Sequence, residues 1–129
     1  MNHRLENEQA VERTLGVHAG ALGDVVLFAH LLARLDAEVT LAAGRAKAEL
    51  LANMRRGARA VVACAIDFDA LPLGELFADA PPEQCRLPGL LGRHERLVSC
   101  YPGEGDRRAQ LRLAAACGAR SILPQVRHC

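Results

Sequence analysis

Hydrophobic positions along the chain alternate between strand-like runs and helical spacing. Residues 14–18, Thr-Leu-Gly-Val-His, predict a short strand, and apolar residues then recur every three or four positions from Asp24 to Leu35. Between them, residues 19–23 contain two glycines and predict a tight turn. The chain therefore opens with a strand, a loop and a helix.

The same alternation continues to the end of the sequence. Four further strands are predicted, at residues 38–42, 60–66, 96–101 and 120–124. Helices are predicted between them at residues 46–54 and 106–117, and a short helix that starts at Pro72 is predicted within residues 67–79, after acidic loop residues. Gly118 ends the last helix. The run at 60–66 is almost continuously apolar, which is typical of a strand covered on both faces. Together these elements predict an α/β fold with a right-handed, Rossmann-like, doubly wound parallel sheet.

The 129 residues predict a polar leader, residues 1–12, followed by one domain, residues 13–129. Hydrophobic residues make up 50% of the chain and aromatic residues only 3%, so the core must be built from Ala, Leu and Val. The leader contains no apolar block and therefore does not resemble a secretory signal. We expect a cytoplasmic protein.

Charge and cysteine content exclude several classes of function. With 16 Lys and Arg against 15 Asp and Glu, the chain lacks the positive surface that nucleic acids require. Its most apolar run, residues 25–33, is much shorter than the roughly 20 residues that span a bilayer. The five cysteines are odd in number and widely spaced, so we expect reduced, mostly buried thiols and neither a disulfide framework nor a metal site.

Candidate chemistry is expected in the loops after the strands, because open parallel sheets bind ligands beyond the carboxyl ends of their strands. In the first loop, Gly20 and Gly23 predict a sharp turn, and Asp24 stands where the helix begins. From the residues alone, Asp24 is an N-cap, the commonest role for Asp at such a position. The N–H groups that follow could also hold an anion.

The common nucleotide-binding motifs do not match this loop. A dinucleotide fingerprint requires glycine where His18 stands, and the second strand ends without an acidic residue. A P-loop requires a Gly-Lys-Ser/Thr sequence that does not follow here. A nicotinamide-binding fold that uses Arg45 for a 2′-phosphate stays open as an alternative.

The first loop resembles that of a known family. Residues 17–27 read Val-His-Ala-Gly-Ala-Leu-Gly-Asp-Val-Val-Leu and are similar to the opening segment of glycosyltransferase family 9, the heptosyltransferase-like enzymes of lipopolysaccharide assembly. In that family the first strand runs into a Gly-Ala/Ser-Leu/Ile-Gly-Asp turn, and residues 20–24 match this core as they stand. Residues 68–73 and 99–106 lie where the family has further loops. The proline usual in the family's first helix is missing.

The resemblance implies the N-terminal, acceptor-side half of a two-domain GT-B fold. It implies inverting transfer of a sugar from a nucleotide-sugar donor to a lipopolysaccharide-type acceptor, with no cofactor. The carried-over role of Asp24 is to take the proton from the acceptor hydroxyl. The implied anion hold is the backbone around Gly20, Ala21, Leu22 and Gly23.

Further candidate contacts follow the third and fourth strands. Asp67 and Asp69 are either ligands of sugar hydroxyls or solvated loop carboxylates, and we select Asp69 as an acceptor contact. Gly103 and Gly105 form a second glycine turn into a helix, where Asp106 is a natural N-cap and a substrate contact is the alternative.

The sequence after the fifth strand offers no donor-binding half. We therefore expect an apparently truncated domain that is inactive without a separate donor-binding domain or chain. The rival interpretation is a non-catalytic α/β module that binds phosphate or a protein partner through the same turn.

Overall fold

The computed structural model of the chain describes residues 13–34, 38–56, 59–78, 81–101 and 106–122. Its strands are β1 (Arg13–Val17), β2 (Glu38–Ala43), β3 (Arg55–Arg56), β4 (Arg59–Ala60), β5 (Cys64–Asp67), β6 (Arg96–Ser99) and β7 (Ser121–Ile122). Its α-helices are α2 (Leu22–Ala33), α3 (Arg45–Ala52), α4 (Leu87–Leu91) and α5 (Arg107–Cys117). Three short 3-10 helices are η1 (Phe68–Ala70), η2 (Leu73–Leu76) and η3 (Pro82–Gln84).

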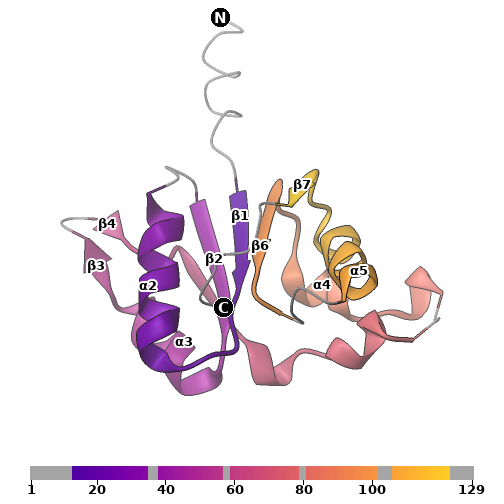
Figure 1. The fold of residues 1–129 in the computed structure, drawn as a ribbon, viewed down its shortest axis with the longest axis horizontal. Coiled ribbons are helices and arrows are strands. Elements are labelled where there is room, and N and C mark those ends of the chain that lie inside the picture. Colours follow the sequence, from indigo (N-terminus) through magenta and orange to yellow (C-terminus); the bar gives the residue numbers. More distant parts are fainter. Residues whose placement is uncertain (1–12, 35–37, 57–58, 79–80, 102–105, 123–129) are drawn as a thin grey trace, which may run out of the picture.

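Five strands form one parallel sheet in the order β5-β2-β1-β6-β7 (Figure 1). At the carboxyl end of β1, Val17 pairs with Ala42 of β2 on one side and with Ser99 of β6 on the other. The predicted Rossmann-like doubly wound fold is thereby confirmed. Because the chain winds outward from β1 in both directions, the winding reverses between β1 and β6, where such sheets characteristically bind ligands.

Alternate side chains of each strand enter two separate cores, one on each face of the sheet. Leu15, Val17 and Leu97 belong to the core that α4 and α5 cover. Leu41 and Val98 belong to the core that α2 and α3 cover. Figure 1 shows the two pairs of helices on opposite sides of the sheet. This alternation follows from the two-residue period of a strand.

Gly16 allows α2 to approach β1 closely. A Cβ atom at this position would lie 2.3 Å from Cδ1 of Leu32 and 3.0 Å from Cε2 of Phe28. Any larger residue would push α2 away from the sheet, because packed side chains leave no room for an extra methyl group. The glycine therefore sets the distance between the first strand and the helix that follows the first loop.

The strand predicted at residues 60–66 is wrong in extent and in burial. β3 and β4 first form a separate antiparallel pair, and β5 begins only at Cys64. Val61 and Val62 are buried, but they precede the strand. β5 lies at the edge of the sheet, so Cys64 is exposed and Ile66 is only partly buried. The apolar run reflects packing of the two valines rather than a strand covered on both faces.

The segment between β5 and β6 also differs from the prediction. The short helix expected to start at Pro72 is present only as the 3-10 turn η2, whose N-cap is Pro72, and a second 3-10 turn, η1, precedes it. A helix, α4, forms between residues 79 and 96, where no helix was predicted. Pro88 lies in its first turn, where the missing N–H of proline leaves no hydrogen bond unmade.

The cysteines depart from the expectation of reduced and mostly buried thiols. Cys64 is free and exposed, Cys85 is free and half-buried, and Cys117 is free and buried. Burial raises the pKa of the Cys117 thiol. Cys100, which was expected to be reduced like the others, is disulfide-bonded.

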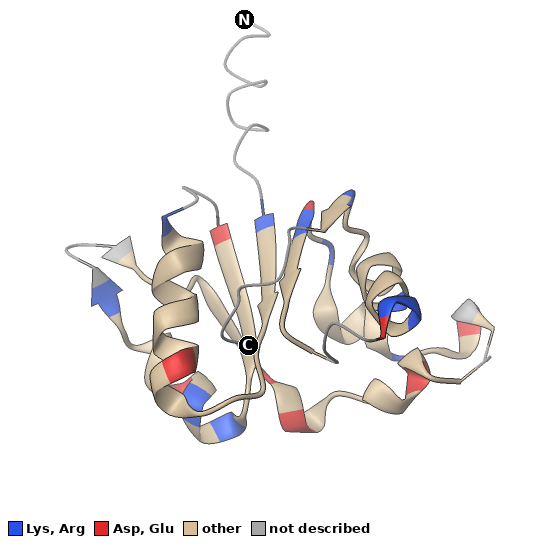
Figure 2. Ribbon diagram, viewed as in Figure 1, with Lys and Arg blue, Asp and Glu red and all other residues tan. Residues whose placement is uncertain are grey.

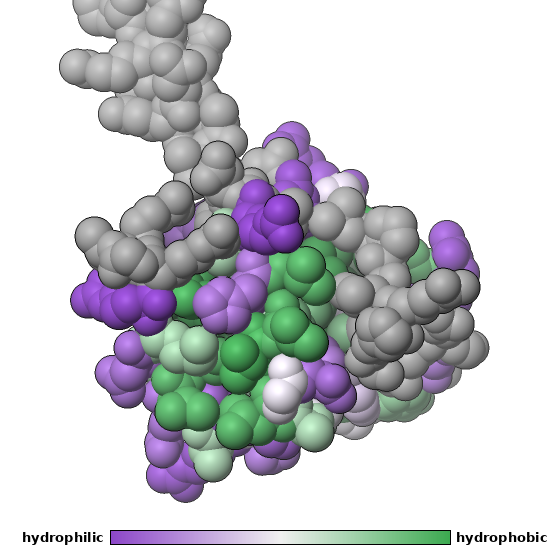
Figure 3. Space-filling view, turned by 60° about the vertical axis from the view of Figure 1, so that its left-hand side comes forward, coloured by the Kyte–Doolittle hydropathy of each residue, from purple (hydrophilic) through white to green (hydrophobic). Residues whose placement is uncertain are grey.

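The outward side of α2 carries exposed leucines. Leu22, Leu27 and Leu31 are 43%, 66% and 45% exposed, and Leu50 of α3 is 50% exposed. Figure 3, turned to bring this side of the molecule forward, shows hydrophobic residues gathered on it. Among the helices that the structure describes, none combines the length and apolar character needed to cross a membrane.

Candidate functional site

The carboxyl edge of the sheet gathers residues from three loops. His18 and Gly20 follow β1, Gly44 and Lys47 follow β2, and Asp69 follows β5. A Cβ atom at Gly44 would lie 3.7 Å from Oδ2 of Asp69 and 3.9 Å from Nζ of Lys47. Residues separated along the sequence therefore converge beside β1 and β2, as the parallel topology requires.

His18 stands at the exit of β1 and is the most constrained side chain of this edge. It is only 3% exposed, and its ring lies 5.1 Å from the ring of Phe28 of α2. Its Nδ1 atom accepts a hydrogen bond from the N–H of Gly20 at 2.9 Å. Burial lowers the pKa of the imidazole, the carboxylate of Asp24 raises it in part, and the ammonium of Lys47 lowers it further. The neutral ring with its proton on Nε2 is thereby favoured.

The two glycines of the first loop have different roles from those predicted. Gly20 is required because a Cβ atom there would lie 2.5 Å from Cε1 of His18. Gly23 is not part of the turn: it is the second residue of α2, and a Cβ atom there would meet nothing within 4 Å. Neither adopts a positive φ, so the turn does not depend on left-handed backbone. The interpretation of Gly23 as a turn residue is therefore wrong.

Asp24 does not cap the helix that it was predicted to begin. The N-cap is Ala21, which has an extended backbone and no side-chain hydrogen bond to the helix. Asp24 lies one turn further, on the exposed surface of α2, close enough to His18 to influence its pKa. Its carboxylate accepts no hydrogen bond from the described residues, so it is available to an external partner.

Lys47 is a cation of this edge that the sequence interpretation did not select. Its Nζ donates a hydrogen bond to the carbonyl oxygen of Gly20 at 2.7 Å, which ties the first loop to α3. It is the single lysine of the chain. The sequence did contain a feature that could have identified Lys47. Arg45 and Lys47 both lie in the first turn of α3, where the helix dipole disfavours positive charge. Such placement suggests a role other than helix stability.

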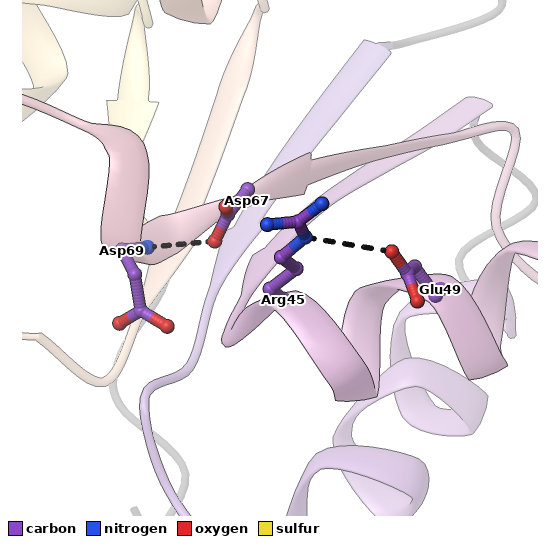
Figure 4. Close-up of polar contacts among 4 residues, drawn as sticks. All are labelled: Arg45, Glu49, Asp67 and Asp69. Atoms are coloured by element: carbon purple, nitrogen blue, oxygen red, sulfur yellow. Dashed lines mark hydrogen bonds and ion pairs between the residues drawn. The ribbon is translucent and has the colours of Figure 1, made fainter.

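Asp67, the last residue of β5, and Asp69, two residues later, have different surroundings (Figure 4). Asp67 caps η1, since its Oδ1 accepts a hydrogen bond from the N–H of Asp69 at 3.0 Å. Asp69 is exposed, and its carboxylate reaches the surface beside Gly44. Arg45 forms an exposed ion pair with Glu49 at 3.6 Å, one turn along α3. The structure thus brings Asp69, the selected acceptor contact, to the same edge as the first loop.

The loop after β6 is described only at its two ends. Ser99 accepts a hydrogen bond from the N–H of Tyr101, whose ring packs edge-on against Phe68 at 5.1 Å. Asp106 caps α5, as predicted, by accepting from the N–H of Ala109 at 3.0 Å. The candidate contacts Gly103 and Gly105 lie outside the described residues.

Helix ends give this edge its electrostatic character. The N-cap residues of α2 and α3 are Ala21 and Gly44, and neither forms a side-chain hydrogen bond to its helix. The N–H groups of both first turns therefore stay open, and the positive ends of both helix dipoles face the edge. Figure 2 shows acidic and basic residues side by side at these helix starts. The combination suits a polar ligand with hydroxyl groups better than a strongly charged one.

Comparison with known proteins provides no match that bears on this site. No family model matches the chain, and no curated protein or solved structure matches it significantly. Within the described part of the chain, no group of three His, Cys, Asp or Glu side chains is arranged to hold a metal ion.

Proposed function

We propose that this edge binds a sugar acceptor and that the chain is the acceptor-side domain of an inverting glycosyltransferase resembling family 9. The observation that carries the proposal is the carboxylate of Asp24. It lies exposed in the first turn of α2, at the ligand-binding edge of the sheet, and it neither caps the helix nor pairs with another described residue. An exposed carboxylate at such an edge that accepts no hydrogen bond from the described residues is available for a chemical role.

The charge balance at the first loop favours a neutral acceptor hydroxyl over a phosphate. An uncapped helix N-terminus is equivalent to about half a positive charge. Asp24 places a full negative charge in the same turn, so it opposes the approach of an anion to these N–H groups. A sugar hydroxyl can donate to the carboxylate instead, and neighbouring hydroxyls can accept from Lys47 or donate to Asp69.

In the proposed reaction, Asp24 acts as general base. The acceptor hydroxyl donates its hydrogen bond to the carboxylate and transfers its proton as its oxygen attacks the anomeric carbon of the donor sugar. The bond from that carbon to the nucleotide phosphate breaks on the opposite side, and the nucleotide leaves with the electron pair. The configuration at the anomeric carbon is therefore inverted.

The remaining residues of the edge would position the acceptor. Lys47 donates a hydrogen bond to the carbonyl of Gly20, and the ring of His18 accepts one from the N–H of Gly20. The loop before Asp24 is therefore held from two sides. This rigidity supports catalysis because a misplaced base loses rate steeply. The donor would be held by a second domain, and the exposed leucines of α2 offer apolar surface for one to pack against (Figure 3).

One observation favours the rival function, a module that binds phosphate without catalysis. The first turns of α2 and α3 are both uncapped, and Lys47 adds a positive charge between them. The same residues would then hold a phosphate group, with Asp24 as an obstacle rather than a base. The two functions predict different ligands for one edge.

Calorimetric titration distinguishes the two. The protein is titrated with a heptose-containing lipopolysaccharide core oligosaccharide and, separately, with inorganic phosphate. The glycosyltransferase proposal predicts saturable binding of the oligosaccharide that Asp24→Asn weakens and Glu38→Gln, at the opposite edge, does not. Absence of oligosaccharide binding would refute it, and phosphate binding strengthened by Asp24→Asn would establish the rival.

A further inference from the structure

A pocket lies at the amino-terminal edge of the sheet, opposite the edge that carries the candidate functional site. It has a volume of about 470 Å³, and the residues that line it are Arg13, Arg93, His94, Glu95, Gly118 and Arg120. These residues lie at the starts of β1, β6 and β7, which are neighbours in the sheet, and at the end of α5. The pocket is therefore separated from the candidate acceptor site by the length of the strands.

Backbone hydrogen bonds hold the floor of this pocket together. The N–H of Glu95 donates to the carbonyl of Arg13 at 2.9 Å, and the N–H of Arg120 donates to the carbonyl of Glu95 at 2.9 Å. The N–H of Arg13 donates to Oε2 of Glu95 at 2.9 Å. Because these backbone donors are already satisfied, a ligand in the pocket would have to be bound by side chains.

The pocket contains an excess of positive charge. Three arginines line it, against the single carboxylate of Glu95. The backbone hydrogen bond from Arg13 lowers the pKa of Glu95, burial opposes this, and the charges of Arg13 and Arg120 lower it further. None of the three guanidinium groups forms an ion pair or a hydrogen bond with another described residue. Within the described part of the chain, their donors are therefore available to an anion.

The remaining wall of the pocket is formed by Gly118, beside the guanidinium of Arg93, and by His94. Gly118 ends α5 in the left-handed conformation, with φ 72° and ψ 20°, and a Cβ atom there would lie 3.4 Å from Cζ of Arg93. His94 is 3% exposed. Its backbone N–H donates a hydrogen bond to the carbonyl of Cys117, and the ring atom Nε2 lies 2.8 Å from the carbonyl oxygen of Leu91. Its Nδ1 has no partner among the described residues, an unsatisfied polar atom of the kind that needs explanation.

We propose that this pocket binds the phosphate group of a small phosphorylated molecule, with Arg93 and Arg120 as its principal ligands and Arg13 as a further positive charge. Guanidinium groups match phosphate oxygens in geometry and charge. The volume falls within the range of small-molecule sites, so it leaves room for an organic body beside the phosphate. The inference does not depend on the glycosyltransferase proposal, because it concerns other residues at another edge.

Nuclear magnetic resonance titration of the full chain tests the proposal. The probes are glucose 6-phosphate, inorganic phosphate and glucose, added at constant ionic strength. We expect the amides of Glu95, Gly118 and Arg120 to shift saturably with glucose 6-phosphate, less strongly with inorganic phosphate, and not with glucose. Shifts confined to residues 20–24 would assign the phosphate to the other edge and overturn the proposal.

Two variants and a matched control measure the role of the arginines. Arg93→Gln and Arg120→Gln are each expected to weaken binding of glucose 6-phosphate at least about fivefold, since each removes charge-assisted hydrogen bonds. Arg34→Gln removes the same charge at the end of α2, outside the pocket, and is expected to change affinity less than about twofold. Circular dichroism verifies folding of each variant. Unchanged affinity in both pocket variants, or an equal loss in the control, would refute the site.

Discussion

The imidazole of His18 and the glycine two residues after it are fitted to one another. Nδ1 of His18 accepts the N–H of Gly20 at 2.9 Å, and a Cβ atom at Gly20 would lie 2.5 Å from the ring. The ring therefore shapes the loop, and the loop fixes which ring nitrogen is unprotonated. This pair holds the backbone immediately before Asp24, the proposed base.

Replacing Gly20 and Gly23 with alanine is expected to have opposite effects. Gly20→Ala should destabilise the fold by about 1–3 kcal/mol, because the new methyl group overlaps the packed ring of His18. Gly23→Ala should stabilise it by about 0.5–1 kcal/mol, because Gly23 lies in a helix with open space around its Cα. Urea unfolding of both variants measures the difference. Equal effects of the two substitutions would contradict the account of the loop.

Acidification should weaken the fold through His18. Its folded-state pKa is lowered below the ordinary value of 6.5, so the unfolded chain binds the proton more tightly than the folded one. The stability due to the neutral ring is complete above about pH 6.5 and decreases as the pH falls toward the folded-state pKa. Protonation of Nδ1 would also remove the acceptor for Gly20.

The pH dependence is measured by thermal unfolding between pH 5 and 7. His18→Gln should flatten the curve in this range, whereas the lowered pKa values of Glu75 and Glu95 act only at more acidic pH. If wild type and variant lose stability in parallel as the pH falls, His18 is not the titrating group.

The contact between α2 and the sheet predicts a third effect. Gly16→Ala should cost about 1–3 kcal/mol, because its methyl group would meet Leu32 and Phe28. Gly74→Ala is the control, since a Cβ atom there meets nothing within 4 Å. Chemical denaturation of the two variants compares them. A stability of Gly16→Ala equal to that of wild type would mean that α2 moves freely on β1.

Sequence periodicity was sufficient for the sheet but not for the details of its edges. The alternation of strands and helices predicted a parallel sheet, since each strand–helix–strand connection is right-handed and brings the next strand back in the same direction. The burial of residues 60–66 was not predictable, because hydrophobicity alone does not distinguish Val61, packed before the strand, from a residue inside it. Edge and central strands differ only in tertiary context.

The candidate site was partly predictable for a related reason. Asp106 and Asp24 look alike in sequence, each at a glycine-containing turn before a helix, yet only Asp106 caps its helix. The difference arises because α2 begins at Leu22, two residues before Asp24, whereas α5 begins directly after Asp106. The role of Lys47 depends on a contact across 27 residues, which no local pattern contains.

Lys47 should control the mobility of the first loop. Lys47→Gln removes the hydrogen bond to the carbonyl of Gly20 and is expected to cost about 0.5–1.5 kcal/mol at most. The amide of Gly20 should then exchange with solvent faster, because the loop opens more often. Hydrogen exchange measured by nuclear magnetic resonance tests this, with Arg45→Gln in the same helix as control. Unchanged exchange at Gly20 would show that the ammonium does not restrain the loop.

The central claim is that Asp24 faces a sugar acceptor at the carboxyl edge, and chemical-shift mapping tests it most directly. The ¹⁵N-labelled protein is titrated with the heptose-containing core oligosaccharide. The account predicts saturable shifts for the amides of residues 18–24 and Lys47, and an affinity at least about fivefold weaker in Asp24→Asn, which keeps the shape but loses the charge. Shifts elsewhere on the protein, or equal affinity in Asp24→Asn and wild type, would contradict it.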